Sequence, residues 1–429
     1  MNELSFVAKK QIYGELTPPP SKSYTHRAIL IASIADGVSH IQNTLVSRDT
    51  IATIESCKAF GANINMNRNQ LAAQIEGTRP RVPDDVINVE NSGTTLRFLT
   101  SVMTGSSRGY AILTGDSSIR RRPMQPLLDS LAGLGGKAYS ARFDGHAPII
   151  AEGETLEGGE TAIEGKVSSQ FVSSILISSV LSRRGVRLFV KGAVSKPYIE
   201  ATLLSMKRFG VEVQRDGFEF FEVSKGAQYS AGDFSIPSDF SSIAFLVGSV
   251  AAAGGKLRLN CSGLDMPQAD SRILTIAKKM GIVVKASGNV LTIESYEDRL
   301  EGGKFELSDS PDLLPVLSVL GLKTKDGIEI RGVEHARFKE TDRISAIREE
   351  LTKAGAVVKE ERDGISVKGG ELVKTTLDSR GDHRLFMAFS LVSLLSHGEI
   401  KVTGEESVDV SYPGYINDLH KIGVEVRRG

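Results

Sequence analysis

The feature that most constrains the fold of this chain is a pattern that occurs six times: an amphipathic helical stretch, a glycine, and a short alternating strand. Successive glycines are 68 to 75 residues apart, a regularity that indicates six copies of one supersecondary unit. Each glycine is expected to end its helix in the left-handed conformation that suits a residue without a Cβ atom. The six are Gly61, Gly135, Gly210, Gly281, Gly355 and Gly423.

A second helical stretch precedes the first in every copy, with a polar start and an apolar run of small residues. Its charge-poor circumference predicts a buried inner helix, whereas the charged helix before each glycine of the first set is expected to lie outside. Runs such as VINVE, YAILTG, VRLFVKG and IEIRGV predict strands between the helices. The inner helices are closed by Gly37, Gly105, Gly185, Gly254, Gly327 and Gly398.

Six units of about 70 residues exceed one hydrophobic core, so the pattern predicts an α/β protein with three units in each of two lobes. The seam is expected near residues 229–238, YSAGDFSIPS, which combine Gly, Pro and Ser without periodicity. A cleft between the two lobes is expected to follow from this division.

Composition and motifs exclude several classes of protein. The 429 residues carry 52 basic and 52 acidic side chains, so no nucleic-acid partner is expected. No run approaches a membrane span, and Cys57 and Cys261 have no metal-ligand spacing, so no membrane partner, metal or disulfide is expected, and a reducing cytoplasm fits. A Walker A loop and a strand-linked GxGxxG are absent, which argues against an NTPase or a Rossmann dehydrogenase.

Arginines gather at the starts of the predicted helices, together with Ser, Thr, Asn and Asp. The small polar residues are explained as ordinary N-caps, but the helix macrodipole disfavours a cation there by about 0.3 to 1 kcal/mol. Several arginines at such positions make sense if the helix starts converge on anions, so a multiply anionic ligand is predicted. The arginines are Arg27, Arg97 and Arg384 in or near first turns, Arg122 before a helix opened by Pro123, and Arg343 within KETDRISAIREEL.

Eight segments that carry these residues resemble the 5-enolpyruvylshikimate-3-phosphate synthases, also called 3-phosphoshikimate 1-carboxyvinyltransferases. The resemblance covers nearly the whole chain, and KETDR and SKPYI are its most specific parts. The segments are PPPSKSYTHRA (18–28), NSGTTLR (91–97), RRRPM (120–124), VSSQF (167–171), SKPYIEATL (195–203), SPDLLP (310–315), KETDR (339–343) and GDHR (381–384).

The resemblance implies a fold and an activity. The implied fold has two domains, residues 20–235 and residues 1–19 with 236–429, each built from three βαβαββ repeats whose buried inner helices point their N-termini at an interdomain cleft. The implied reaction transfers the enolpyruvyl group of phosphoenolpyruvate to the 5-hydroxyl of shikimate 3-phosphate and releases phosphate, a step towards aromatic amino acids. No metal or organic cofactor is implied, and a cytoplasmic monomer is expected.

By resemblance, shikimate 3-phosphate is bound by His335 and by residues of five of these segments, in which hydroxyls and backbone N–H groups can surround a phosphate. Without the resemblance, Ser195 and Tyr198 are explained equally well as a turn serine and a core tyrosine. The full set is Lys22, Ser23, Arg27, Ser168, Ser169, Gln170, Ser195, Tyr198, Asp312, His335 and Lys339.

Phosphoenolpyruvate needs forked cationic donors from several sides, because it carries a phosphate and a carboxylate. The resemblance assigns its binding to Lys22, Asn91, Gly93, Arg122, Gln170, Arg343 and Arg384. Arg97 is expected to support the site rather than to bind the ligand. A glycine at position 93 either serves only the geometry of the helix start or lets the ligand approach the backbone. The second reading predicts inhibition by glyphosate, an anionic inhibitor of this family that occupies the phosphoenolpyruvate site.

The implied reaction needs two proton transfers, for which two carboxylates are the natural pair. The resemblance assigns Asp312 as the base towards the 5-hydroxyl and Glu340 as the acid that protonates the methylene carbon. Lys22 and Lys339 would stabilise charge on the phosphates. Asp49 and His383 are further catalytic candidates, and His383 is equally well explained as a structural histidine.

Two positions depart from the pattern of enterobacterial and plant members. His335 replaces an asparagine, and Val410 replaces a lysine, which removes one cation for phosphoenolpyruvate. The related transferase that acts on UDP-N-acetylglucosamine is an alternative, but its usual cysteine is missing from GDSSIRRRPM. A non-catalytic anion-binding protein is a second alternative, against which the presence of Asp312 and Glu340 argues.

Overall fold

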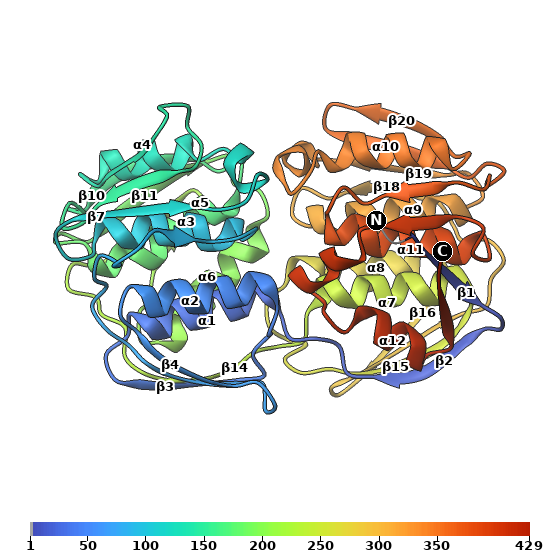
Figure 1. Ribbon diagram of the computed structural model, residues 1–429, viewed down its shortest axis with the longest axis horizontal. Helices are drawn as coiled ribbons and strands as arrows, with labels where there is room; N and C mark the ends of the chain where they lie inside the picture. The colour runs from blue at the N-terminus through green and yellow to red at the C-terminus, as the bar shows by residue number, and fades with distance from the viewer. Residues whose placement is uncertain (1–2) are drawn as a thin grey trace. The chain divides into compact units, whose positions relative to one another are not determined.

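The computed structural model describes residues 3–429, which divide into two compact units (Figure 1). The first unit is Pro20–Pro237, and the second unit joins the segment up to Pro19 to Ser238–Gly429. The bounds expected from the sequence, 20–235 and 1–19 with 236–429, differ from this division by two residues at one boundary. Within residues 3–429, no helix is both long enough and apolar enough to cross a bilayer.

The first unit contains twelve strands and six α-helices. The strands are β3 (Val38–Gln42), β4 (Asn63–Asn67), β5 (Ala72–Glu76), β6 (Ile87–Asn88), β7 (Tyr110–Thr114), β8 (Lys137–Ser140), β9 (Ile149–Glu152), β10 (Gly159–Glu164), β11 (Val186–Lys191), β12 (Gln214–Asp216), β13 (Phe220–Val223) and β14 (Asp233–Ser235). The helices are α1 (Lys22–Ser33), α2 (Arg48–Ala59), α3 (Gly93–Thr104), α4 (Gln125–Gly133), α5 (Ser169–Ser178) and α6 (Lys196–Arg208), with the 3-10 turns η1 (Ile119–Arg121) and η2 (Ser179–Leu181).

The second unit has the same inventory of strands and α-helices with more 3-10 turns. The strands are β1 (Glu3–Ala8), β2 (Ile12–Leu16), β15 (Gly255–Asn260), β16 (Val283–Ser287), β17 (Val290–Ser295), β18 (Gly303–Glu306), β19 (Ile328–Arg331), β20 (Val357–Glu361), β21 (Gly364–Lys368), β22 (Thr376–Asp378), β23 (Lys401–Thr403) and β24 (Val424–Arg428). The helices are α7 (Phe240–Ala253), α8 (Arg272–Lys279), α9 (Leu314–Leu320), α10 (Arg343–Lys353), α11 (His383–Leu395) and α12 (Tyr415–Lys421). The turns are η3 (Ala269–Ser271), η4 (Pro311–Leu313), η5 (Gly321–Lys323), η6 (Glu334–Phe338) and η7 (Glu405–Val410).

All six sheets have four strands in the same order, a parallel pair followed by two antiparallel neighbours. In the sheet β6-β7-β9-β8, helix α3 connects the parallel strands β6 and β7, and α4 connects β7 to the hairpin of β8 and β9. The chain order of this repeat is therefore βαβαββ. This confirms the predicted α/β fold of six related units.

Three of the sheets contain a strand from a distant part of the chain. Strand β1 pairs antiparallel with β23 and β24, so that Leu4 lies opposite both Val402 and Arg428. Strand β2 pairs in parallel with β15, and β14 pairs in parallel with β3. The N-terminal segment thus completes two sheets of the second unit, which is why it belongs to that unit.

The inner helices are buried over almost their whole length, as predicted from their lack of charge. All twelve residues of α3 are buried, and so are the first twelve of the fourteen residues of α7. Helices α2, α6, α8, α10 and α12 instead bury one face and expose charged residues on the other. In each unit the sheets lie around the inner helices (Figure 1). Every glycine of the first predicted set has a positive φ, which confirms its role in ending a helix.

One strand was missed and one local prediction was wrong. Residues 229–238, predicted as the seam between the lobes, include the unit boundary at Pro237 and Ser238 but also contain β14, whose Phe234 pairs with Ile41 of β3 and is buried. A strand of three residues is too short for periodicity to reveal it. Pro123 does not open a helix, because α4 begins at Gln125 and carries Pro126 in its first turn. Arg122 instead lies directly after η1.

Candidate active site

In the first unit, Lys22 at the start of α1 faces Asp49 at the start of α2. Lys22 Nζ donates a 2.8 Å hydrogen bond to Asp49 Oδ2, and both side chains are largely buried. Ser47 caps α2 by accepting from the backbone N–H of Thr50, which orients the first turn that carries Asp49. The neighbouring Ser23 is half-buried on α1. Asp49, a further catalytic candidate from sequence, is thus the direct partner of Lys22.

Gln170 of α5 connects two inner helices through its side-chain amide. Its Oε1 accepts a 2.6 Å hydrogen bond from Arg97, and its Nε2 donates to Thr94 at 2.9 Å. The Arg97 guanidinium also lies 5.2 Å from the ring centre of Phe171. Arg97 therefore holds Gln170 in place, which agrees with the supporting role expected for it. Thr94 was not singled out in the sequence.

Asn91, Gly93 and Arg122 form a second group at the start of α3. Arg122 Nη2 lies 3.3 Å from Asn91 Oδ1 and 3.3 Å from Ser118 Oγ, and Asn91 also donates to Asp116 at 2.6 Å. A Cβ atom added to Gly93 would lie only 2.6 Å from Arg122 Nη1. Glycine at position 93 is what allows this guanidinium to lie against the first turn of the helix.

Arg27 is buried in the interior of the first unit. Its Nε donates to Thr202 at 2.7 Å, and its two terminal nitrogens donate to the carbonyl oxygens of Ser23 at 2.8 Å and Tyr198 at 3.0 Å. Burial lowers its pKa to about 10. The guanidinium therefore connects α1 to α6. Arg27, assigned by resemblance to shikimate 3-phosphate binding, is only 1% exposed in this structure.

The predicted serines lie at two helix starts. Ser168 caps α5, its Oγ accepting from the N–H of Gln170 at 3.2 Å, and Ser169 is the first residue of that helix. Ser195 caps α6 in a left-handed conformation with φ of 54°, and Tyr198 lies in the first turn of α6. A non-glycine residue in this region is uncommon and marks a locally constrained backbone.

In the second unit, Arg343 is surrounded by three carboxylates. Its Nη1 donates to Asp312 at 2.7 Å, its Nη2 to Glu340 at 2.7 Å and its Nε to Asp382 at 2.8 Å. Asp382 is fully buried and caps α11 by accepting from the N–H of Arg384 at 2.9 Å. Asp382 was not predicted from the sequence, although its place before His383 in GDHR is the position of an N-cap.

Asp312 is also approached by two further cations. Arg384 Nη2 lies 3.0 Å from Asp312 Oδ2, and Lys339 Nζ lies 3.7 Å from Asp312 Oδ1. Burial raises the pKa of Asp312, but Arg384, Lys339 and Arg343 together hold it well below the usual value. Asp312 is therefore an ionised carboxylate within a cationic cluster.

Two histidines lie in this part of the second unit. His335 is buried in η6, where desolvation and the nearby Lys339 lower its pKa to about 4. It is therefore uncharged at neutral pH and, like the asparagine it replaces, offers hydrogen bonds without a positive charge. His383 is the first residue of α11 and is buried. Val410, which stands in place of a lysine, is buried at the end of η7.

A further buried carboxylate, Asp270 in η3, was missed by the sequence analysis. It accepts a short hydrogen bond from Ser241 near the start of α7. Burial raises the pKa of Asp270 to about 7, Asp312 adds to the rise and Arg384 opposes it. Its oxygen Oδ1 has no hydrogen-bond partner within residues 3–429. No local sequence signal distinguishes this aspartate from an exposed one.

The contacts within each unit bring the starts of inner and outer helices together. In the first unit, Lys22 and Arg27 of the inner helix α1 bond to Asp49 of the outer helix α2 and to Tyr198 of the outer helix α6. Gln170 joins the inner helices α5 and α3, and Thr53 and Thr95, which were not predicted, join α2 to α3. In the second unit, Arg343 and Arg384 join the starts of α10 and α11 to η4. Most of the predicted residues of each unit therefore gather at one end of its inner helices.

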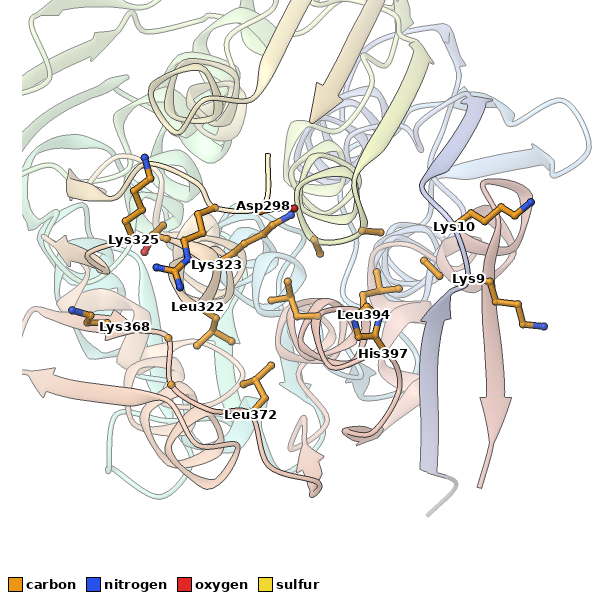
Figure 2. Close-up of a pocket in the computed structure, with 18 residues that line it drawn as sticks. Lys9, Lys10, Asp298, Leu322, Lys323, Lys325, Lys368, Leu372, Leu394 and His397 are labelled. Atoms are coloured by element: carbon orange, nitrogen blue, oxygen red, sulfur yellow. The ribbon is translucent and has the colours of Figure 1, made fainter. Parts of the chain in front are cut away.

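A cavity of about 920 Å³ lies at the opposite end of the inner helices of the second unit (Figure 2). It is lined by the last residues of α7 and α11 and by several lysines, and none of the predicted site residues lines it. Lys323 donates to the carbonyl of Ala251 at 2.7 Å and points towards Asp298, and Lys325 pairs with Glu301. Cations at helix C-termini neutralise exposed carbonyls, which explains Lys323, and Lys325 is explained by its ion pair.

This chain is similar to known proteins over nearly its whole length. A family model described as EPSP synthase (3-phosphoshikimate 1-carboxyvinyltransferase) matches residues 7–419. A protein named 3-phosphoshikimate 1-carboxyvinyltransferase from Methanothermobacter thermautotrophicus is 43% identical over 422 residues, 98% of each chain. The protein of that name from Nitrosopumilus maritimus is 41% identical over 424 residues, 98% of this chain and 99% of the relative.

Solved structures share the fold at lower identity. The EPSP synthase of Acinetobacter baumannii has a TM-score of 0.81 at 23% identity, with 100% of both chains covered. The enolpyruvyl transferase NikO of Streptomyces tendae has a TM-score of 0.80 at 17% identity, with 100% of this chain and 99% of the other covered. Because its family model and its relatives match over nearly its whole length, the chain belongs to the EPSP synthase (3-phosphoshikimate 1-carboxyvinyltransferase) family.

Proposed function

We propose that this protein transfers the enolpyruvyl group of phosphoenolpyruvate to the 5-hydroxyl of shikimate 3-phosphate and releases phosphate. The observation that carries the proposal is the single guanidinium of Arg343, which holds the carboxylates of Asp312 and Glu340 at 2.7 Å each. Two carboxylates oriented by one buried cation suit a reaction that takes a proton from oxygen and gives one to carbon.

The first step adds the substrate hydroxyl to phosphoenolpyruvate. The 5-oxygen forms a bond to C2 of phosphoenolpyruvate, the hydroxyl proton goes to Asp312, and the methylene carbon C3 receives a proton from Glu340. The tetrahedral adduct then loses phosphate by cleavage of the bond between C2 and the phosphate oxygen. C3 returns a proton to Glu340, and the proton held by Asp312 passes to the departing phosphate, so that both carboxylates are restored. In this scheme Lys22 and Lys339 stabilise the charge on the phosphate as it leaves.

The electrostatics of Asp312 favour proton abstraction from the hydroxyl only after phosphoenolpyruvate has bound. In the cluster described above, Arg384, Lys339 and Arg343 keep the pKa of Asp312 well below its usual value, which makes it a weak base. The phosphate and carboxylate of phosphoenolpyruvate would compete for the same cations. Binding of that anion then raises the basicity of Asp312, because part of the positive charge around it is neutralised.

The phosphoenolpyruvate contacts are proposed to come from Lys22, Asn91, Gly93, Arg122 and Gln170 of the first unit and from Arg343 and Arg384 of the second. Arg122 supports this assignment because its hydrogen bonds to Asn91 and Ser118 are long, at 3.3 Å each. A carboxylate or phosphate offers a guanidinium shorter and stronger hydrogen bonds than these.

Shikimate 3-phosphate is proposed to contact Lys22, Ser23, Ser168, Ser169, Gln170, Ser195 and Tyr198, with Arg27 beneath them, and Asp312, His335 and Lys339 of the second unit. The N-terminal turn of α5 supports this, since the exposed N–H groups of a helix start favour a phosphate. An uncharged His335 is better suited to a hydrogen bond with a hydroxyl of the acceptor than to binding a second phosphate.

The choice of acceptor distinguishes this proposal from a transfer to UDP-N-acetylglucosamine. The fold alone does not decide it, because another enolpyruvyl transferase has the same fold. Both cysteines are buried, and desolvation raises the pKa of Cys57 to about 12 and of Cys261 to about 11. Neither thiol is therefore suited to acid or nucleophile work at neutral pH.

Phosphate release tests the function directly. The protein is mixed with phosphoenolpyruvate and either shikimate 3-phosphate or UDP-N-acetylglucosamine, and phosphate is measured over time. Phosphate release is expected in the mixture with shikimate 3-phosphate and not in the mixture with UDP-N-acetylglucosamine. Release only with the nucleotide sugar would favour the alternative transferase, and release with neither would refute both. We further propose a cytoplasmic monomer, which fits the two free thiols and is tested by sedimentation equilibrium.

A further inference from the structure

A chain of buried hydrogen bonds connects the start of α3 to His26, which lies beside the carboxylate that holds Lys22. His26 Nδ1 lies 2.6 Å from Thr53 Oγ1, Thr53 Oγ1 lies 2.6 Å from Thr95 Oγ1, and Thr95 Oγ1 lies 2.7 Å from Ser92 Oγ. All four side chains are at most 2% exposed. The chain crosses three helices, because His26 is on α1, Thr53 on α2 and Thr95 on α3.

The other ring nitrogen of His26 faces Asp49. His26 Nε2 lies 4.0 Å from Asp49 Oδ2, and neither His26 Nε2 nor Asp49 Oδ1 has a hydrogen-bond partner among the residues described. Burial, with Lys22 and Arg27 nearby, lowers the pKa of His26 well below its usual value, so the ring is neutral. A neutral ring has one N–H, and the hydrogen-bond chain decides which nitrogen carries it.

Each hydroxyl has a single proton, so a chain whose hydrogen bonds all run the same way has two possible directions. In one, Nδ1–H donates to Thr53, and the hydroxyls donate in turn towards Ser92. The lone pair of Nε2 then faces the Asp49 carboxylate, and the Ser92 proton has no acceptor within residues 3–429. In the other, Ser92 donates to Thr95, Thr95 to Thr53 and Thr53 to Nδ1. Every hydroxyl proton is then used, and Nε2–H points at Asp49.

We infer that His26 is a positioning residue: the Ser92–Thr95–Thr53 chain holds it as the Nε2–H tautomer, which orients Asp49 and, through Asp49, Lys22. This inference rests on the proposed function for the role of Lys22. Ser92 also caps α3 between Asn91 and Gly93. The same chain therefore couples Lys22 to the segment proposed to bind phosphoenolpyruvate, although neither His26 nor Thr53 is proposed to touch a substrate.

The tautomer is tested first, without any activity measurement. In protein labelled with nitrogen-15 at histidine, the ring signals of His26 are identified by their loss in His26→Gln. In the unaltered protein we expect His26 to have a protonated Nε2 and an unprotonated Nδ1. In Thr53→Val, which removes the hydroxyl donor at nearly constant volume, the Nδ1 signal is expected to move. A protonated Nδ1 in the unaltered chain would overturn the inference.

Steady-state kinetics test the positioning role. Thr53→Val is expected to raise the KM for phosphoenolpyruvate by about 10-fold, the effect of about 1.4 kcal/mol, while Thr53→Ser stays within about 2-fold because it restores the donor. The control is Thr100→Val, which removes a buried hydroxyl of α3 that donates to the carbonyl of Leu96. It is expected to leave the KM unchanged.

These outcomes separate the inference from the proposed function. An unaltered chain without phosphate release would refute the function, whereas the tautomer measurement would still stand. Equal KM values for Thr53→Val and Thr53→Ser in an active enzyme would refute the positioning role. A loss of thermal stability shared by Thr53→Val and Thr100→Val, with no change in KM, would show that the hydrogen-bond chain is structural only and would also refute it.

Discussion

Arg343 donates a 2.7 Å hydrogen bond from Nη1 to Oδ1 of Asp312, and the guanidinium is 1% exposed. The contact joins the start of α10 to η4, so two segments that are separate in sequence share one charge pair. Because Glu340 and Asp382 bind the same guanidinium, this cation serves both as a structural centre and as part of the proposed catalytic group.

The first prediction concerns the two carboxylates. Asp312→Asn and Glu340→Gln keep the size and the acceptor oxygen of each side chain but remove its capacity to take or give a proton. Each is expected to lower kcat by about 10² to 10⁴-fold, with shikimate 3-phosphate affinity changed much less. Phosphate release and calorimetric titration measure the two quantities. A variant with near-normal kcat would show that its carboxylate does no proton transfer.

The second prediction concerns stability around Arg343. Arg343→Lys keeps the charge but cannot donate to three carboxylates at once, so Asp382 or Asp312 would be left buried without its partner. We expect the free energy of unfolding to fall by about 3 kcal/mol, measured by urea denaturation. Arg348→Lys, on an exposed face of the same helix, is the control and should change it by about 0.5 kcal/mol or less. Equal effects would contradict a special role for Arg343.

The third prediction concerns the pH dependence of stability. The pKa of Asp270 is about 7 in the folded chain, above the value of about 3.9 expected after unfolding. The folded state therefore holds a proton that the unfolded state has released, and this contribution to stability is lost as the pH rises from about 4 to about 7. Asp270→Asn carries no charge at any pH, so its Tm relative to the unaltered chain should rise over that range.

Thermal unfolding followed by circular dichroism at several pH values measures this difference. Asp265→Asn removes an exposed carboxylate from the same segment and serves as the control. The difference between its Tm and that of the unaltered protein should stay constant over this pH range. A constant difference between Asp270→Asn and the unaltered protein would mean that folding does not raise the pKa of Asp270.

The fourth prediction concerns Gly93 and glyphosate. A methyl group at this position would lie 2.6 Å from Arg122 Nη1 and must displace the guanidinium. The longer inhibitor has less room to adjust than phosphoenolpyruvate, so Gly93→Ala is expected to weaken glyphosate inhibition more than it raises the phosphoenolpyruvate KM. Inhibition constants and KM for both proteins give the ratio. Equal changes for the two ligands would leave Gly93 with a backbone role only.

The repeat pattern was the part of the fold that could be read from sequence. A glycine after each amphipathic helix and an apolar helix before it are local features, because each depends on residues a few positions apart. The α/β class, the six repeats and the distinction between inner and outer helices followed from them. Strand β14 was missed, since its three residues form a strand only by pairing with β3, almost two hundred residues away.

The sequence by itself determined which chemical groups are present at the helix starts: arginines, lysines and the carboxylates of SPDLLP and KETDR. Only the tertiary structure decided which of them meet. It joined Arg343 to Asp382 and Lys22 to Asp49, and it buried Arg27 and Asp270, so that desolvation and the nearby Asp312 raise the pKa of Asp270 to about 7. The physical reason is that a side chain's charge, partners and pKa depend on burial and on neighbours within a few ångströms, which the packing of separate helices brings together.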